Sequence, residues 1–478
     1  MSDAPTIVWF RDDLRIADHA ALTAAAQQDA PLICVFVLDE QSKGVRAYGG
    51  ASRWWLAQSL RALDHELRKC DQKLVLRHGA AADVIPALAR EANASRVYWN
   101  RRYDQAGISV DDAVVAKLKD DHINGGTFPG NLLFEPGRIQ TKDGGPLRVF
   151  TPFWKRILAM GELRKPVPAP TSLPPTIDDV SSDTLDDWQL EPSRPDWAGG
   201  IREAWTPGEA TAREQLADFI DGIKGYSENR DRPDRSATSR LSPHLRFGEI
   251  SPIDIFHAAR FAADKGSPSR DIEKFLSELG WREFSYHLLH RYPDLATRNL
   301  QQRFDAFPWR SDAEALKAWQ QGRTGYPIVD AGMRELWHTG WMHNRVRMVT
   351  ASFLIKHLLI DWRLGEQWFW DTLVDADPAN NTASWQWVAG SGADAAPYFR
   401  IFNPILQGEK FDPDGAYVRQ WVPEIAGLPD KFIHKPWLAS DQILAGAGIT
   451  MGESYPNPII DHDTARKRAL AAFAYVRA

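Results

Sequence analysis

Short apolar runs alternate with amphipathic stretches over the first part of the chain. The apolar runs occupy residues 6–10, 31–38, 73–79 and 96–100. Stretches with the 3.6-residue period of a helix lie between them and include residues 52–68 and 81–91. Continuous apolar strands separated by helices predict a parallel sheet covered on both faces, and hence a Rossmann-like α/β domain in residues 1–130.

The pattern changes after this region. Residues 166–207 are rich in proline, serine and aspartate, which is typical of a connection, and we assign residues 131–207 to it. Helical periodicity then continues almost to the end, for example in residues 211–223, 252–263, 272–289 and 326–339. We therefore expect a large all-helical domain over residues 208–478.

Composition agrees with a folded protein of at least two domains. The chain has 478 residues, 44% of them hydrophobic and 25% charged, which excludes a disordered polypeptide. No uncharged apolar run is long enough to cross a bilayer, and residues 1–15 lack the pattern of a secretion signal. Because Cys34 and Cys70 are the only cysteines, no disulfide framework is expected, and we predict a cytoplasmic protein.

Charge and aromatic content bear on nucleic-acid binding. A net charge of −6 argues mildly against a protein that coats nucleic acid non-specifically. Residues 336–360 nevertheless contain no acid while they hold Arg345, Arg347 and Lys356. The chain has 20 tryptophans, and this excess requires an explanation in core packing, stacking or redox chemistry.

Several common enzyme signatures are missing from the sequence. It has no GxxxxGK[ST], no GxGxxG between a strand and a helix, and no GxSxG, HExxH or CxxC. Asp375, Asp377, Asn380 and Asn381 surround a turn, but the glycine and glutamate of a calcium loop are absent. We therefore predict no metal site. The carboxylates of Asp375 and Asp377 could instead pair with Arg347 or accept hydrogen bonds from a heterocyclic ligand.

Residues 238–251 combine hydroxyl groups with a helix start. Thr238, Ser239 and Ser242 could cap that helix or bind a phosphate at its first turn. Just upstream, Tyr226 and Arg230 combine an aromatic ring with a cation, which suits a phosphate-bearing ligand. Acidic neighbours dilute this pattern, and a plain capped helix is the alternative.

Two further stretches place ligand-binding side chains on single helical faces. Glu278, Trp281 and Arg282 stand at i, i+3 and i+4, and a carboxylate beside an indole can hydrogen-bond and stack on a base. Asn344 and Met348 share a face that suits an uncharged heteroaromatic ligand. The alternatives are amphipathic helices with a core tryptophan, a Glu–Arg pair and arginines that extend towards solvent.

Four long motifs make the chain resemble the photolyase and cryptochrome family of flavoproteins. They are VWFRDDLRIADHAAL at 8–22, VFTPFWK at 149–155, TGYPIVDAGMREL at 324–336 and APYFRIFNPILQGEKFD at 396–412. His19 stands where the family usually has asparagine. The match covers nearly the whole chain, in the family's order, and implies that the helical domain binds FAD while the α/β domain can carry an antenna pigment.

The resemblance also implies which residues hold the flavin. By similarity Tyr226 and the run Thr238, Ser239, Arg240, Leu241 and Ser242 bind the diphosphate. Arg347 and Asp375 are expected to form an ion pair against the isoalloxazine ring, and Asp377 is expected to contact the flavin. Asn381 is expected to face flavin N5.

The implied substrate is a cyclobutane pyrimidine dimer in DNA. By resemblance Trp281 stacks on the flipped dimer, Glu278 hydrogen-bonds it, and Asn344 and Met348 complete the pocket. Excited reduced FAD donates an electron, the ring splits and the electron returns, so the protein would be a carbon–carbon lyase. The candidates for contacts with DNA are Arg230, Arg282, Arg345, Arg400 and Gln407.

Part of the tryptophan excess matches the family's electron relay. Trp385, Trp362 and Trp309 are expected to reduce oxidised flavin from the surface inward, with Trp387 as an alternative branch. The remaining tryptophans are expected to serve packing.

Within the family, the pocket residues favour dimer repair over the alternative, a cryptochrome-type blue-light sensor without repair activity. The Glu–Trp pair that plant cryptochromes tend to lose is kept, and residues 49–60 resemble the bacterial branch close to those cryptochromes. The antenna is expected to be 5,10-methenyltetrahydrofolate on Trp54 and Trp55, or alternatively 8-hydroxy-5-deazaflavin. A helix that packs both tryptophans on the sheet is an equal alternative, and we expect a monomer without an obligate protein partner.

Overall fold

The computed structural model describes residues 4–141, 143–177, 179–395 and 399–476. The first three residues of the motif at 396–412 therefore lie outside the described residues. The chain forms two compact units, each assembled from segments distant in sequence. The sheet unit comprises Met1–Ala198, Trp205–Lys224 and Ser239–Pro293, and the helical unit comprises Gly199–Ala204, Gly225–Thr238 and Asp294–Ala478.

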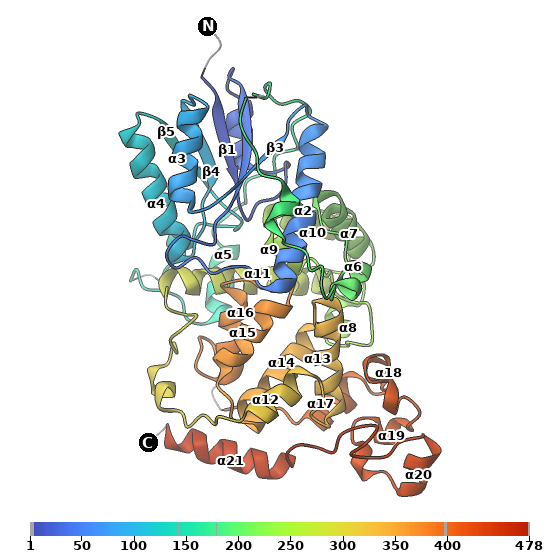
Figure 1. The fold of residues 1–478 in the computed structure, drawn as a ribbon. Coiled ribbons are helices and arrows are strands. Elements are labelled where there is room, and N and C mark those ends of the chain that lie inside the picture. The colour runs from blue at the N-terminus through green and yellow to red at the C-terminus, as the bar shows by residue number, and fades with distance from the viewer. Residues whose placement is uncertain (1–3, 142, 178, 396–398, 477–478) are drawn as a thin grey trace. The chain divides into compact units, whose positions relative to one another are not determined.

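A five-stranded parallel sheet forms the centre of the sheet unit (Figure 1). Its order is β3 (Leu74–His78), β2 (Leu32–Leu38), β1 (Thr6–Phe10), β4 (Arg96–Asn100) and β5 (Asn124–Phe128). Every residue of β1 and β2 is buried, as expected for strands covered on both faces. The predicted parallel α/β arrangement is confirmed.

Side chains on one face of the sheet share a core with two helices. Alternate strand residues, such as Ile7 and Trp9, pack with residues of α3 (Ala81–Glu91) and α4 (Gln105–Asp120). This alternation follows from the two-residue period of a strand. Figure 1 shows α2 (Gly50–Arg68) on the opposite side of the sheet from α3 and α4. Helix α1 (Ala20–Ala26) follows β1 in the chain.

Strand β5 was not predicted, because its sequence NGGTF has no apolar run. A side chain at Gly126 would meet the Tyr98 ring of β4 at 2.6 Å. Only glycine allows β4 and β5 to approach here. The same glycine that lets the two strands pair also makes β5 difficult to predict from the sequence.

The proline-rich connection is hydrogen-bonded to strands β2 and β3 of the sheet. The backbone nitrogen of Leu32 donates to the carbonyl of Pro175, and Asp183 nitrogen donates to the Leu76 carbonyl. The Ser182 hydroxyl accepts from Leu76 nitrogen at 3.0 Å. Short helical turns at η2 (Leu185–Trp188) and α6 (Gly199–Ala204) interrupt it.

Helices complete the sheet unit. They include η1 (Pro136–Arg138), α5 (Phe150–Leu158), α7 (Glu209–Asp221), α9 (Ser242–Arg246), α10 (Pro252–Asp264) and α11 (Ser269–Arg291). The periodicity that predicted helices at 211–223, 252–263 and 272–289 is confirmed within a few residues.

The helical unit contains the remaining helices around one large apolar core. Trp319, Trp362 and Trp385 are almost fully buried in that core. The main helices are α12 (Ala313–Gln320), α13 (Pro327–Thr339), α14 (Asn344–Ser352), α15 (Trp362–Thr372), α16 (Asn380–Ala389), α17 (Pro404–Phe411), α18 (Ala416–Trp421) and α21 (His462–Tyr475). Shorter ones are α8 (Tyr226–Asn229), η3 (Gln302–Ala306), a π-helical turn η4 (Phe353–His357), η5 (Pro423–Ile425), α19 (Asp430–Ile433), η6 (Pro436–Leu438) and α20 (Asp441–Gly446).

Candidate functional site

Arg347 and Asp375 form a two-pronged ion pair in the helical unit. The two guanidinium nitrogens donate to the two carboxylate oxygens at 3.0 and 2.8 Å, and the Asp375 side chain is only 4% exposed. Arg347 Nε also donates to the Met342 carbonyl at 2.7 Å. The expected ion pair is therefore present, two-pronged and buried on its acidic side, while its contact with a flavin stays a prediction.

Asn381 lies in the first turn of α16 and is 8% exposed. Its Nδ2 donates to Glu366 of α15 twice, to the carbonyl oxygen at 3.1 Å and to Oε1 at 2.8 Å. Because these bonds use the amide nitrogen, the carbonyl oxygen Oδ1 is the atom left to accept from a ligand.

Asp377 helps to start α16. Its Oδ1 accepts from the backbone nitrogens of Ala379 at 2.9 Å and Asn380 at 2.7 Å. The side-chain amide of Asn380 donates to the same oxygen at 2.9 Å. Asp377 thus shapes the turn that carries Asn381, and a flavin contact for it stays a prediction.

None of the hydroxyl groups of Thr238, Ser239 and Ser242 occupies the N-cap position of helix α9. Helix α9 begins at Ser242, but its N-cap residue is Leu241, whose apolar side chain cannot accept a hydrogen bond. The prediction that a hydroxyl caps this helix is therefore wrong, because the capping position falls on an apolar residue. Ser242 is exposed, whereas Leu241 is buried and Thr238, Ser239 and Arg240 are half-buried.

Tyr226 stands at the start of α8 in the helical unit and is 7% exposed. The Arg230 guanidinium lies 5.7 Å from its ring centre. The expected combination of an aromatic ring with a cation is thus a real contact.

Arg345, which follows Asn344 in the first turn of α14, is held from three sides. Its Nη2 donates to Asp231 at 2.7 Å, and its guanidinium lies 4.4 Å from the Phe411 ring. Its Nη1 lies 3.8 Å from Met348 Sδ, while Asn344 is exposed on the same turn. The acidic residue that dilutes the charge pattern in the sequence is therefore a direct partner of a candidate DNA-binding arginine.

His343 joins the same cluster. Its Nδ1 accepts from Arg345 nitrogen at 3.2 Å, so the ring caps α14. Burial lowers the pKa of His343 to about 4, which keeps the ring neutral near neutral pH.

The other candidate DNA contacts differ in exposure. Arg400 is exposed, with its guanidinium 4.7 Å from the Phe402 ring, whereas Arg230 is 8% exposed. Within the described part of the chain, Gln407 Oε1 is buried and accepts no hydrogen bond. A buried acceptor without a donor is unfavourable, so Gln407 is suited to a polar ligand.

In the sheet unit, Trp281 stacks on Phe150. The ring centres are 3.7 Å apart and the planes differ by 8°. Phe150 belongs to α5, and Gly280 lets Trp154 of the same helix approach α11, because a side chain at Gly280 would meet that indole at 2.5 Å. One face of the Trp281 ring is therefore covered by protein, and sequence reasoning did not identify Phe150 as the cover.

Glu278 pairs with Lys274 one turn earlier in α11, at 2.8 Å. Its side chain is 28% exposed. Among the described residues no Glu278–Arg282 pair forms, since Arg282 instead donates to the Asn131 carbonyl.

Arg282 is 8% exposed and donates to the Asn131 carbonyl at 2.7 Å. Neighbouring Glu283 accepts from Leu133 nitrogen at 2.9 Å. Both residues fasten the segment 131–133 to α11, and this bonding argues against a role for Arg282 in gripping DNA.

The three tryptophans expected to form the relay lie in or against one apolar core of the helical unit. Trp385 and Trp362 are 2% and 0% exposed, and Trp309 is half-buried against the same core. A side chain at Gly365 would meet the Trp385 ring at 2.2 Å, so glycine allows that indole to lie directly on α15. Burial therefore decreases from Trp385 and Trp362 to Trp309, as a path towards the surface requires.

Trp54 and Trp55 are 1% and 0% exposed. Trp55 stacks on Phe247 at 6.2 Å and donates from Nε1 to Glu249 at 3.0 Å. Two fully enclosed rings offer no face to a pigment, so the structure favours the packing alternative over antenna stacking for both residues.

Neither a metal site nor a membrane span is found among the described residues. No group of three or more His, Cys, Asp or Glu side chains there is arranged to hold a metal ion. Likewise, no helix in that part of the chain is both long and apolar enough for a membrane span.

Comparison with known proteins first defines the class. The model for the FAD binding domain of DNA photolyase matches residues 275–475, and the model for DNA photolyase matches residues 6–172. A parallel α/β unit combined with a helical FAD-binding domain makes the chain a two-part flavoprotein.

The relatives then establish the family. A deoxyribodipyrimidine photo-lyase of Agrobacterium fabrum is 54% identical over 100% of this chain and 99% of its own. The crystal structure of a bacterial class III photolyase from Agrobacterium tumefaciens superimposes with a TM-score of 0.97 at 53% identity, covering 100% of this chain and 98% of that one. Cryptochrome-2 of Arabidopsis thaliana is 38% identical over 99% of this chain and 79% of its own. The chain belongs to the DNA photolyase and cryptochrome family.

Proposed function

We propose that the protein is a deoxyribodipyrimidine photo-lyase, which uses light to split cyclobutane pyrimidine dimers in DNA. The observation that carries this proposal is its 54% identity to a full-length relative of that name. The retained Glu278 and Trp281 agree with repair, because both would contact the dimer.

The residues expected to hold FAD fit this group by their chemistry. The planar ion pair of Arg347 and Asp375 suits a flat heterocycle with donors and acceptors on its edge. Tyr226 and the run Thr238, Ser239, Arg240, Leu241 and Ser242 would hold the diphosphate, for which hydroxyls and backbone nitrogens are suitable partners. When bound, FAD supplies absorption of visible light and one-electron chemistry that side chains lack.

Asn381 would favour reduced flavin by acting as an acceptor. Its amide nitrogen is used by Glu366, so Oδ1 would face flavin N5, which carries a hydrogen when the flavin is reduced. Asp377 would contact the flavin from the turn before α16. Glu366 thus sets the orientation of the amide and, through it, the redox preference of the site.

The dimer would be bound by stacking and hydrogen bonding. Phe150 covers one face of Trp281, so the opposite face would take the flipped bases. Glu278 would accept from a pyrimidine N–H, and Asn344 and Met348 would complete the pocket. Lys274, one turn earlier in α11, pairs with Glu278 at 2.8 Å.

DNA would be held by a few cations despite the net charge of −6. Arg230, Arg345 and Arg400 would contact phosphates, and Gln407 would bond the lesion strand. Such contacts position the strand without reading its sequence. Arg282 is left out of this set because it is buried and bonded to Asn131.

Trp385, Trp362 and Trp309 would carry electrons from the surface to oxidised flavin. Their order of burial supports this role, since an electron source in solution reaches the half-buried Trp309 first.

An antenna pigment in the sheet unit is also part of the proposal. We propose 5,10-methenyltetrahydrofolate, with 8-hydroxy-5-deazaflavin as the alternative, bound by residues other than the enclosed Trp54 and Trp55. The absorption and fluorescence of pigment released on denaturation distinguish the two. We further propose a cytoplasmic monomer, which size-exclusion chromatography and cell fractionation would test.

A blue-light sensor without repair activity is the second candidate. It is favoured by the 38% identity to Cryptochrome-2 of Arabidopsis thaliana over 99% of this chain. The deciding experiment illuminates chemically reduced protein with thymine-dimer DNA and measures dimer loss. Dimer loss that needs blue light supports repair, whereas tight dimer binding without light-dependent loss supports the sensor.

A further inference from the structure

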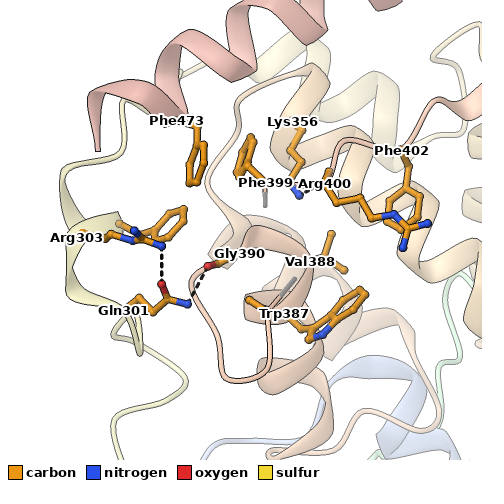
Figure 2. A pocket seen from close by; sticks show the side chains of 12 residues that line it. Gln301, Arg303, Lys356, Trp387, Val388, Gly390, Phe399, Arg400, Phe402 and Phe473 are labelled. Carbon is orange, nitrogen blue, oxygen red and sulfur yellow. Dashed lines mark hydrogen bonds between the residues drawn. The ribbon is translucent and has the colours of Figure 1, made fainter. Parts of the chain in front are cut away.

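A cavity of about 230 Å³ lies in the helical unit, apart from the residues proposed for the flavin and the dimer (Figure 2). Among the described residues it is formed by η3 with Gln301 before it, the turn η4, the end of α16, residues 390–395 and 399–402, and the C-terminal part of α21. Its lining residues are Gln301, Arg303, Phe304, Lys356, Trp387, Val388, Gly390, Ala395, Phe399, Arg400, Phe402 and Phe473.

Three cations line this cavity, and none of its described lining residues is acidic. Lys356 is 3% exposed, while Arg303 and Arg400 are exposed. Across the described residues, no carboxylate forms an ion pair with any of the three. This excess of positive charge is unusual for a protein with a net charge of −6.

The ammonium group of Lys356 has spare hydrogen-bonding capacity. Its only described acceptor is the Arg400 carbonyl, and it lies 4.4 Å from the Phe399 ring centre. An ammonium carries three N–H donors, so two have no acceptor within the described chain. Burial, with Arg400 nearby, lowers the pKa of Lys356 to about 7, which is the expected effect when a buried amine lacks a counter-charge.

Aromatic rings form the rest of the wall. Phe399 and Phe473 stack with centres 4.5 Å apart and planes within 10°. Trp387 and Phe402 also line the cavity (Figure 2). Phe304 is a further aromatic residue of its lining. Aromatic surfaces interleaved with cations are the combination that proteins use to bind single nucleotides of a strand.

Size limits the occupant to one ring. An apolar cavity of about 150 Å³ holds benzene, so the present cavity admits a single six-membered ring but leaves its substituents at the mouth. A pyrimidine has carbonyl oxygens for the buried ammonium of Lys356. A phosphate at the mouth would meet the exposed Arg303 and Arg400.

We propose that this cavity binds a pyrimidine nucleotide, with the ring between the aromatic side chains and the phosphate on the two arginines. The nucleotide comes either from the free pool or from a DNA strand, and both present the same chemistry. The inference does not require the proposed repair activity, and it shares only Arg400 with the proposed DNA contacts.

The test is isothermal titration of the flavin-containing protein in the dark with dTMP, thymidine and inorganic phosphate. We expect dTMP to bind at least tenfold more tightly than either fragment, because the site needs both ring and phosphate. Arg303→Gln should weaken dTMP binding at least threefold. The matched control is Arg298→Gln, a residue that is 65% exposed, pairs with Asp294 and does not line the cavity.

Lys356→Met removes the buried donors, and circular dichroism must first show that the variant folds. If it folds, dTMP binding should fall at least tenfold. If it does not fold, Arg303→Gln decides alone. Failure of dTMP to bind, or equal binding to wild type and Arg303→Gln, would overturn the proposal.

A single-stranded oligothymidylate distinguishes the two sources. Competition with dTMP and tighter binding than dTMP assign the site to a strand, whereas binding of dTMP alone assigns it to the free nucleotide. Flavin content and dimer loss are measured on the same Arg303→Gln protein. Normal repair with weakened dTMP binding in this variant supports both the cavity site and the proposed function. Wild-type protein that binds dTMP but shows no light-dependent dimer loss would contradict only the proposed function.

Discussion

At the scale of single residues, the proposed dimer site depends on which face of Trp281 is open to a ligand. The Phe150 ring covers one face of the Trp281 indole, with the ring centres 3.7 Å apart. Only the opposite face of the indole can therefore stack on a ligand. A ring held in place loses little freedom when it binds, which increases the net stabilisation from stacking.

Trp281→Ala should therefore weaken binding of dimer-containing DNA by roughly 1–3 kcal/mol, the size of one lost stacking contact. Fluorescence-anisotropy titration with matched damaged and undamaged duplexes measures the loss. The control is Trp154→Ala, which removes an indole of α5 that contacts Gly280 rather than the proposed ligand face. Unchanged affinity of the Trp281 variant for the dimer would argue against stacking.

Asp231 is the second residue with a measurable role. Its carboxylate pairs with Arg345 at 2.7 Å and lies 3.8 Å from Arg230 Nε. A phosphate must compete with this carboxylate for the arginines. If Arg230 and Arg345 contact DNA as proposed, Asp231 would therefore reduce the affinity for any phosphate backbone.

Asp231→Asn should raise the affinity for undamaged DNA. It should also steepen the slope of log K against log salt by about 0.9 for each additional phosphate that the protein neutralises. The matched control is Asp234→Asn, which changes the net charge equally but releases Arg232, its partner at 2.7 Å. Binding titrations from low to high salt compare the two. Identical slopes for both variants would reject a specific role of Asp231.

At the scale of elements, the buried carboxyl group of Glu283 bonds α11 to the segment 131–133, which is distant in sequence. Glu283 is 3% exposed and accepts from Leu133 nitrogen, and burial raises its pKa from 4.5 to about 7. The folded state therefore holds a proton that the unfolded chain releases above about pH 4.5. The stabilisation of the folded state by protonated Glu283 is complete below about pH 4.5 and is lost as the pH rises through 7.

Glu283→Gln should remove this part of the pH dependence. Between pH 4.5 and 7 the wild-type free energy of unfolding should fall by roughly 3 kcal/mol relative to the variant, at about 1.4 kcal/mol for each unit of pKa shift. Urea unfolding at several pH values measures the difference. Parallel curves for the two proteins would show that Glu283 is ionised throughout.

At the scale of the whole molecule, the proposed function separates the reduction of flavin from the repair of DNA. In that proposal the tryptophans Trp385, Trp362 and Trp309 are needed only when the flavin must be reduced by light. Loss of one of them should therefore leave repair by chemically reduced protein intact.

Trp385→Phe should abolish photoreduction and keep light-driven dimer loss after chemical reduction. Flavin absorption under blue light measures the first activity, and a dimer assay measures the second. Trp319→Phe is the matched control, because Trp319 is equally buried and packs against Trp385 at 6.2 Å but lies outside the relay. Equal loss of both activities in Trp385→Phe would refute this division.

Some features were predictable because they depend on local pattern. The strands at 6–10 and 31–38 and the helix at 272–289 follow from runs and periods that a window of the sequence contains. The ion pair of Arg347 with Asp375 was expected only through the family resemblance, since 28 residues separate the two. Strand β5 escaped because glycine, which the sheet needs there, signals a turn in isolation.

Alone, the sequence determined the parallel α/β part, the helical part and the family, because periodicity and long motifs are properties of the chain itself. Tertiary structure decided which side chains can still act. It enclosed Trp54 and Trp55, bonded Arg282 to Asn131 and fixed the amide of Asn381 through Glu366. The physical reason is that burial and hydrogen-bond partners come from segments distant in sequence, and these set what each group can still bind.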